Sequence, residues 1–153
     1  MKINNFITTN QTHNTTTIND IRVFEGKYNV KLPGDYVEFL LRFNGGDVEL
    51  DEDGGTYIEG LKDKIHMDVF FGVNTGSEGL DIETWTDDYS DELPEGIILI
   101  GCSYEQGLVA LHCVDGERCL SYWDHTWEFE CSNEESNSYF ISNTFTEFLA
   151  ASR

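Results

Sequence analysis

The stretch from Leu32 to Gly46, LPGDYVEFLLRFNGG, narrows the possible folds more than any other part of the chain. Its large apolar residues recur at i, i+3, i+4 and i+7, which places them on one face of an α-helix: Tyr36, Phe39, Leu40 and Phe43. Pro33 precedes the helix, where its missing N–H costs nothing, and Asp35 lies in the first turn, where its charge meets the positive end of the dipole. Asn44-Gly45-Gly46 favours the left-handed conformation that ends helices. The stretch therefore predicts an amphipathic helix with one face in a core.

Hydrophobic periodicity predicts three further helices. They span residues 17–29, 82–89 and 144–150. The first has a suitable N-cap in Thr17, with Asp20 three residues later, and Asn29 is a suitable end. Large apolar side chains lie on one face of each helix, so we expect all of them to pack against a common core.

Short apolar runs predict the strands of a sheet at residues 69–72, 97–100, 108–113, 118–123 and 139–141. Asp115-Gly116 predicts a hairpin turn between two of them, whereas residues 57–67 leave the choice between strand and loop open. The order of elements indicates one α+β domain over residues 17–153, with a mostly antiparallel or mixed sheet and helices packed on one side. Residues 1–16 are polar and aperiodic, so we expect a loosely attached leader there.

The helix-forming stretch also resembles the LP-x-D-Y-x-x-F-L-x-x-x-N-G-G signature of the SUKH superfamily, which includes fungal cell-wall assembly regulators and many bacterial immunity proteins. Further landmarks follow in the family's order: Ile21, Phe24 and Glu25; Leu93-Pro94-Glu95-Gly96 with Ile97, Ile100 and Gly101; Leu108 to Leu111; Tyr122-Trp123-Asp124; and Phe145, Phe148 and Leu149. The resemblance covers about residues 18 to 149. It implies the SUKH α+β fold and a role in binding other proteins.

The net charge of −20 is the strongest compositional constraint on partners. Such a surface repels nucleic-acid phosphates and anionic lipid and attracts basic proteins or cations. The segment from Asp47 to Glu95 holds sixteen acidic residues against two lysines, so the imbalance is concentrated there. We therefore expect neither a nucleic acid nor a membrane as partner; the alternative is that the acidity serves only solubility.

No apolar run of transmembrane length and no signal-peptide core occur, which predicts a cytoplasmic protein. In that compartment free thiols are the expected state of the four cysteines, Cys102, Cys113, Cys119 and Cys131. The alternative is a disulfide between Cys113 and Cys119, which flank the predicted hairpin turn.

The chain lacks the patterns that enzymes and metal sites require. No G-x-S-x-G, phosphate loop or dinucleotide fingerprint is present. A run from Glu49 to Gly54 resembles the start of a calcium loop, but Gly60 stands where that loop needs its glutamate. The zinc-capable residues lack the paired spacing of zinc ligands: His112, Cys113, Cys119, His125 and Cys131. We predict a non-enzyme with no cofactor and no metal.

Four aromatic residues are candidates for a binding surface: Trp85, Tyr122, Trp123 and Trp127. Because Tyr122 and Trp123 are adjacent in a strand, they face opposite sides of the sheet, so we expect one in the core and the other exposed. Core positions are the simpler interpretation for most of the four. An exposed tryptophan beside acids is typical of a binding hot spot.

The resemblance implies, as our leading hypothesis, an immunity protein that binds and neutralises a cognate bacterial toxin, a basic nuclease-type effector, by covering it with an acidic surface. The candidate contacts are Asp47, Glu49, Asp51, Glu52, Asp53, Asp87, Asp88, Asp91 and Glu92. Two alternatives remain open: a regulatory scaffold related to the cell-wall assembly regulators, and a small-ligand or metal-binding module. The sequence specifies neither the toxin nor the oligomeric state.

Overall fold

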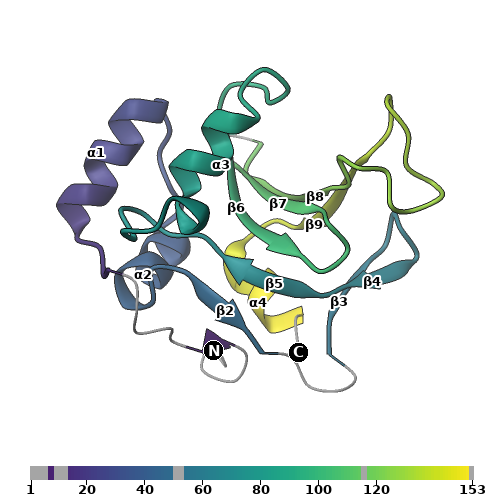
Figure 1. Ribbon diagram of the computed structural model, residues 1–153, viewed down its shortest axis with the longest axis horizontal. Helices are drawn as coiled ribbons and strands as arrows, with labels where there is room; N and C mark the ends of the chain where they lie inside the picture. Colours follow the sequence, from purple (N-terminus) through teal and green to yellow (C-terminus); the bar gives the residue numbers. More distant parts are fainter. Residues whose placement is uncertain (1–6, 9–13, 50–53, 115–116, 152–153) are drawn as a thin grey trace.

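In the residues that the computed structural model describes (7–8, 14–49, 54–114 and 117–151), seven strands form one sheet in which every neighbouring pair is antiparallel (Figure 1). The strand order is β1-β2-β5-β6-β7-β8-β9. The bounds are β1 Ile7–Thr8, β2 Gly46–Val48, β5 Met67–Phe70, β6 Ile97–Ser103, β7 Leu108–His112, β8 Cys119–Trp123 and β9 Ser138–Ser142. A separate hairpin pairs β3 (Thr56–Ile58) with β4 (Asp63–Ile65). The mostly antiparallel α+β sheet expected from the sequence is confirmed.

The four predicted helices are confirmed within a few residues at each end. They are α1 (Ile18–Tyr28), α2 (Gly34–Arg42), α3 (Ile82–Asp88) and α4 (Phe145–Ala151), and a short 3₁₀ turn, η2 (Glu78–Leu80), precedes α3. The caps explain the bounds of α1, because Thr17 Oγ1 accepts the Asp20 N–H at 3.1 Å and Asn29 ends the helix with φ 52°.

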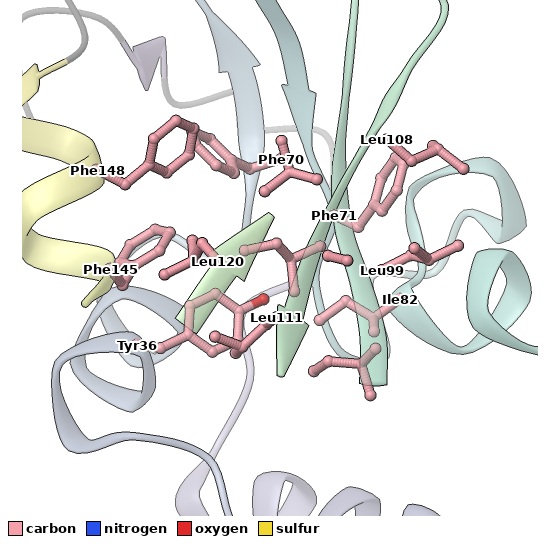
Figure 2. Close-up of a cluster of buried hydrophobic side chains, with 14 of the residues drawn as sticks. Tyr36, Phe70, Phe71, Ile82, Leu99, Leu108, Leu111, Leu120, Phe145 and Phe148 are labelled. Atoms are coloured by element: carbon pink, nitrogen blue, oxygen red, sulfur yellow. The ribbon is translucent and has the colours of Figure 1, made fainter. Parts of the chain in front are cut away.

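The sheet separates two apolar layers, which Figure 2 shows with the strands between them. On one face, the ring of Phe70 lies 5.8 and 6.0 Å from the rings of Phe145 and Phe148 in α4. On the other face, Phe71 stacks on Trp85 of α3 at 4.7 Å. Consecutive residues of extended backbone point to opposite faces. The helices therefore lie on both faces of the sheet, with α2 and α4 on one face and α3 on the other, and not all on one side as the sequence analysis expected.

The Asn44-Gly45-Gly46 turn after α2 is buried, and the Asn44 side chain bonds it to two other segments of the chain. Asn44 is left-handed, with φ 49°, and its amide nitrogen donates to the carbonyl oxygens of Asn14 and Val73 at 2.9 Å each. Its amide oxygen accepts the Val73 N–H at 2.7 Å. Gly45 has φ 85°, and a Cβ there would lie 2.5 Å from the Phe70 carbonyl oxygen. Position 45 must therefore be glycine for α2 to lie against β5, and Asn44 provides the side-chain hydrogen bonds of the turn.

Asp35 of the signature links the first turns of two helices that are far apart in sequence. One carboxylate oxygen accepts the Tyr36 N–H at 2.8 Å. The other accepts both the backbone N–H and the hydroxyl of Thr146, each at 2.9 Å. These contacts satisfy a backbone donor in the first turn of α4 and fix α4 beside α2.

One further expectation needs correction, and two others fall wholly or largely outside the described residues. Tyr122 and Trp123 are both buried, because Trp123 packs against Tyr89 and His125 at 5.3 and 5.1 Å and is only 9% exposed. The turn Asp115-Gly116 lies outside the described residues, although β7 and β8 pair as the hairpin requires. Most of the expected leader also lies outside them; within it, β1 pairs with β2.

Candidate functional site

The acidic residues predicted to contact a partner lie on two separate parts of the surface. The first group lies on and just after β2 and comprises Asp47 and Glu49. The second lies at the end of α3 and in the turn after it: Asp87, Asp88, Asp91 and Glu92. α3 meets the start of β6, whereas β2 connects through β5 to the end of β6. The structure therefore does not bring the groups together. Three further candidates, Asp51, Glu52 and Asp53, lie outside the described residues.

The first group forms what we call the β2 surface, made of Asp47, Glu49, Asp68, Tyr104 and Glu105. Asp68 raises the pKa of Tyr104, because its charge opposes the phenolate and it accepts the hydroxyl's hydrogen bond. Tyr104 is 65% exposed, but its polar end is thus held. Glu105 accepts the backbone N–H of His66 at 2.8 Å and lies 2.6 Å from its ring Nδ1. Two acids of this surface, Asp68 and Glu105, therefore already interact with Tyr104 and His66 of the same chain.

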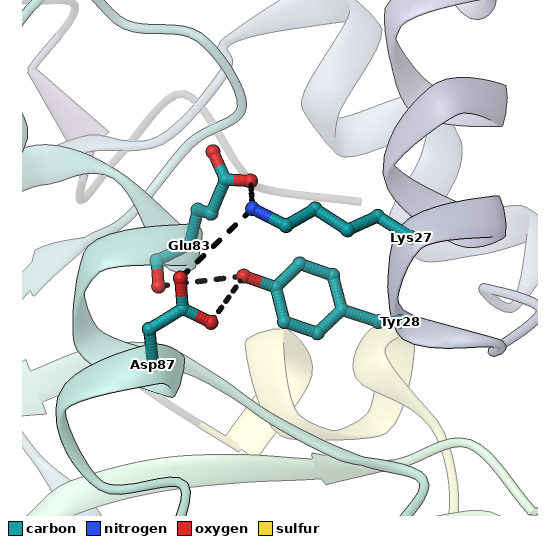
Figure 3. A network of polar contacts seen from close by, with 4 residues as sticks. All are labelled: Lys27, Tyr28, Glu83 and Asp87. Carbon is teal, nitrogen blue, oxygen red and sulfur yellow. Dashed lines mark hydrogen bonds and ion pairs between the residues drawn. The ribbon is translucent and has the colours of Figure 1, made fainter.

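The second group begins with a network that joins α3 to α1, shown in Figure 3. Lys27 forms an ion pair with Glu83, and its Nζ lies 3.9 Å from Asp87 Oδ2. The hydroxyl of Tyr28 donates to Asp87 Oδ1 at 2.7 Å. Burial and this hydrogen bond raise the pKa of Tyr28. Asp87 therefore holds the two helices together while its side chain remains 54% exposed.

A cleft of about 180 Å³ adjoins this network between α1 and the start of β6. Its walls include Val30, Leu93 and Ile97, with the carboxylates of Asp87 and Glu95 at the same lining. Among the described residues no group of three or more His, Cys, Asp or Glu side chains is placed to hold a metal ion.

The remaining acids of the second group, Asp88, Asp91 and Glu92, are exposed. Tyr89, between them, packs edge-on against His125 at 5.1 Å. Burial, together with the charges of Glu92 and Asp88, raises the pKa of Tyr89. This contact places the end of α3 beside His125, at the start of the loop of residues 124–137 that connects β8 to β9.

Residues 124–137 project from the body of the molecule on the right of Figure 1. The fully buried Asp124 organises the start of this loop, since its two carboxylate oxygens accept the N–H groups of Glu128 and Phe129 at 3.0 Å. Its carbonyl oxygen accepts the Trp127 N–H, also at 3.0 Å. Phe129 packs back against Tyr122. The result is a tight turn with Trp127 at its tip.

We call the combined region the α3–loop surface and define it as Asp88, Asp91, Glu92, Trp127, Glu128 and Glu130. All six side chains are exposed. Sequence analysis named the three α3 acids and included Trp127 among four aromatic candidates. It missed the two glutamates, because their proximity to α3 depends on the contact of Tyr89 with His125, residues 36 positions apart in the chain.

Burial makes three of the four thiols poor nucleophiles at neutral pH. Burial raises the pKa of Cys102 to about 11 and that of Cys113 to about 12, and it also raises the pKa of Cys119. All four cysteines are free. No helix in the described part of the chain is long and apolar enough to cross a membrane.

A family model for the SMI1 / KNR4 family (SUKH-1) matches residues 15–151. The chain belongs to the SMI1 / KNR4 family (SUKH-1). A comparison with curated proteins found no match. SUKH-1 proteins are generally non-enzymatic and act through contacts with other proteins. Asp35, Asn44 and Gly45 belong to the signature seen in the sequence, and in the structure they form the link to α4 and the buried turn after α2.

Proposed function

We propose that this SUKH-1 protein is an immunity protein that binds and neutralises a cognate toxin by covering a basic surface of it, without chemistry. The observation that carries the proposal is the α3–loop surface, which combines five exposed acidic residues and an exposed tryptophan in a chain of net charge −20. A toxin that acts on nucleic acid needs cationic side chains to hold phosphates. An acidic protein complements that surface and speeds the encounter with it.

The first test is co-expression with the toxin domain encoded beside this gene, followed by a pull-down across a salt series. Rescue of growth and a complex that weakens as salt rises support neutralisation through an acidic surface. Rescue with a salt-insensitive complex retains the function and assigns the interface to apolar contacts. If the toxin domain kills the cells and no complex forms, the proposal is wrong for that pair, and a regulatory scaffold becomes the better hypothesis.

Charge-reversed variants then separate the two acidic surfaces. Asp91→Lys with Glu92→Lys changes the α3–loop surface, and Asp47→Lys with Glu49→Lys changes the β2 surface. Glu38→Lys with Glu147→Lys is the matched control, because it reverses two exposed acids on α2 and α4, which cover the opposite face of the sheet from α3. We expect the first pair to weaken the complex most. Asp87 is left unchanged, since its reversal would disrupt the contact with Tyr28.

A further inference from the structure

Trp127 is the most exposed tryptophan of the chain and the least connected to it. Its side chain is 50% exposed, whereas Trp85 stacks on Phe71 and Trp123 is buried. Among the described residues the indole has no hydrogen-bond or ring partner; only the backbone N–H is bonded, to Asp124. A half-exposed ring in the turn that begins this loop contributes little to the core of the fold.

The backbone of Trp127 is held in a conformation that disfavours this residue type. Its φ is 56°, in the left-handed region where Gly and Asn occur readily and a bulky residue is a rare outlier. Such a residue costs about 1–2 kcal/mol and persists only where surrounding contacts determine the turn. Asp124 provides those contacts through three hydrogen bonds. The turn therefore fixes the backbone from which the indole projects before any partner arrives.

The loop that carries Trp127 is acidic, and its charge indicates the chemistry of the partner. Residues 124–137 contain four exposed glutamates, Glu128, Glu130, Glu134 and Glu135, and no lysine or arginine. The acids at the end of α3 adjoin the loop through Tyr89 and His125. A cationic side chain can lie over the indole face while its charge meets the carboxylates. An acidic or phosphate-bearing partner would be repelled.

We infer that Trp127 is the anchor residue of the partner interface, and that it binds an apolar site bordered by lysine and arginine on the toxin domain. The inference rests on the proposed function and specifies which side chain dominates it. Tryptophan is among the residue types most enriched at interface hot spots. Fixing the backbone of the turn in advance lowers the entropy lost on binding.

The test measures affinity of a catalytically inactivated toxin domain for the wild type and two variants. Trp127→Asn keeps a residue suited to the left-handed turn and removes the ring. Phe140→Thr is the matched control, because Phe140 is a similarly exposed aromatic, at 57%, on β9 and outside the loop. We expect Trp127→Asn to weaken binding by about 30-fold or more and Phe140→Thr to change it by less than about threefold.

The outcomes distinguish failure of this inference from failure of the proposed immunity function. If the wild type binds and Trp127→Asn binds within about threefold of it, the anchor is wrong and the immunity function stands. If the wild type itself fails to bind or rescue, both are overturned. If Trp127→Asn lowers the melting temperature by more than about 8 °C, the indole supports the fold, which also contradicts the inference.

A second measurement needs no folded variant. Protein labelled with 5-fluorotryptophan gives one ¹⁹F resonance for each of its three tryptophans, and the signal of the most exposed ring is identified by its sensitivity to the solvent. We expect unlabelled toxin domain to shift or broaden that resonance most. A complex in which the exposed signal stays unchanged would rule out Trp127 as the anchor.

Discussion

Two left-handed turns of this protein differ in what occupies them. At residues 44–46 the turn is built from Asn and Gly, the residue types that tolerate positive φ, and the Asn44 side chain is buried and bonded on three sides. At Trp127 the same backbone region holds a bulky residue whose side chain is exposed, and a neighbouring carboxylate maintains the turn. In the buried turn, the residue types match the left-handed backbone. In the exposed turn, the residue type does not match it, and strained residues of this kind are expected mainly at functional sites.

Gly45→Ala, in the first of these turns, should lower the free energy of unfolding most. The added Cβ would meet the Phe70 carbonyl oxygen at 2.5 Å in a backbone with φ 85°, so α2 would have to move away from β5. We expect a loss of about 3 kcal/mol or more in the free energy of unfolding, measured by urea titration. Gly26→Ala is the control, because it enters open space in α1 and should stabilise by up to about 1 kcal/mol. Equal stability of the two variants would contradict the account of this turn.

Asn44→Asp tests the side chain rather than the backbone. The shape and the tolerance of positive φ remain, but the two donated hydrogen bonds to the carbonyl oxygens of Asn14 and Val73 are lost and a charge is buried. We expect a loss of about 3 kcal/mol. Asn29→Asp makes the same exchange at the exposed, left-handed end of α1, and its midpoint should hardly change. If both variants lose the same stability, the three bonds of Asn44 are not what matters.

Asp124→Ala removes the group that maintains the second turn. The N–H groups of Glu128 and Phe129 lose their acceptors, although water can reach a loop of this kind. The expected loss is about 2 kcal/mol, together with faster amide exchange at these two positions. The exposed Asp91→Ala serves as control and should change neither measurement. Unaltered exchange in Asp124→Ala would show that the loop is held by something other than this carboxylate.

Trp127→Asn should have the smallest effect on folding. Relief of the unfavourable backbone state and loss of the half-buried ring act in opposite directions, so we expect the free energy of unfolding to change by less than about 1 kcal/mol. Urea and thermal midpoints provide the measurement. A loss as large as that of Asp124→Ala would mean that both turns serve the fold, and the contrast between them would disappear.

Much of the fold follows from local patterns in the sequence. The spacing of Tyr36, Phe39 and Leu40 identifies α2, and the strands at 97–103 and 108–112 follow from their apolar runs. The caps at Thr17 and Asn29 also act locally and were predicted. By contrast, the bond from Asp35 to Thr146 spans 111 residues, and no pattern in either segment indicates the other.

The candidate site was predictable in composition and not in arrangement. Counting charges identified the acids at the end of α3, but only the fold shows that Asp87 is engaged by Tyr28. Adjacent strand positions predicted opposite faces for Tyr122 and Trp123, yet which faces are covered depends on α3, whose placement follows from Phe71. The left-handed state of Trp127 depends on hydrogen bonds to the carbonyl and carboxylate oxygens of Asp124 and contradicts the preference of tryptophan itself.

Phe70 and Phe71 couple the stability of the two apolar layers on either side of the sheet. One ring belongs to the layer beneath α4 and the next to the layer beneath α3, so a single peptide bond joins the two cores. Neither layer can open far without displacing the end of β5 and therefore disturbing the other. The protein should consequently unfold in one cooperative transition, and slow amide exchange in β6 should report the same opening free energy as exchange in α4. The surface around Trp127 is in this way supported by packing on the far side of the sheet.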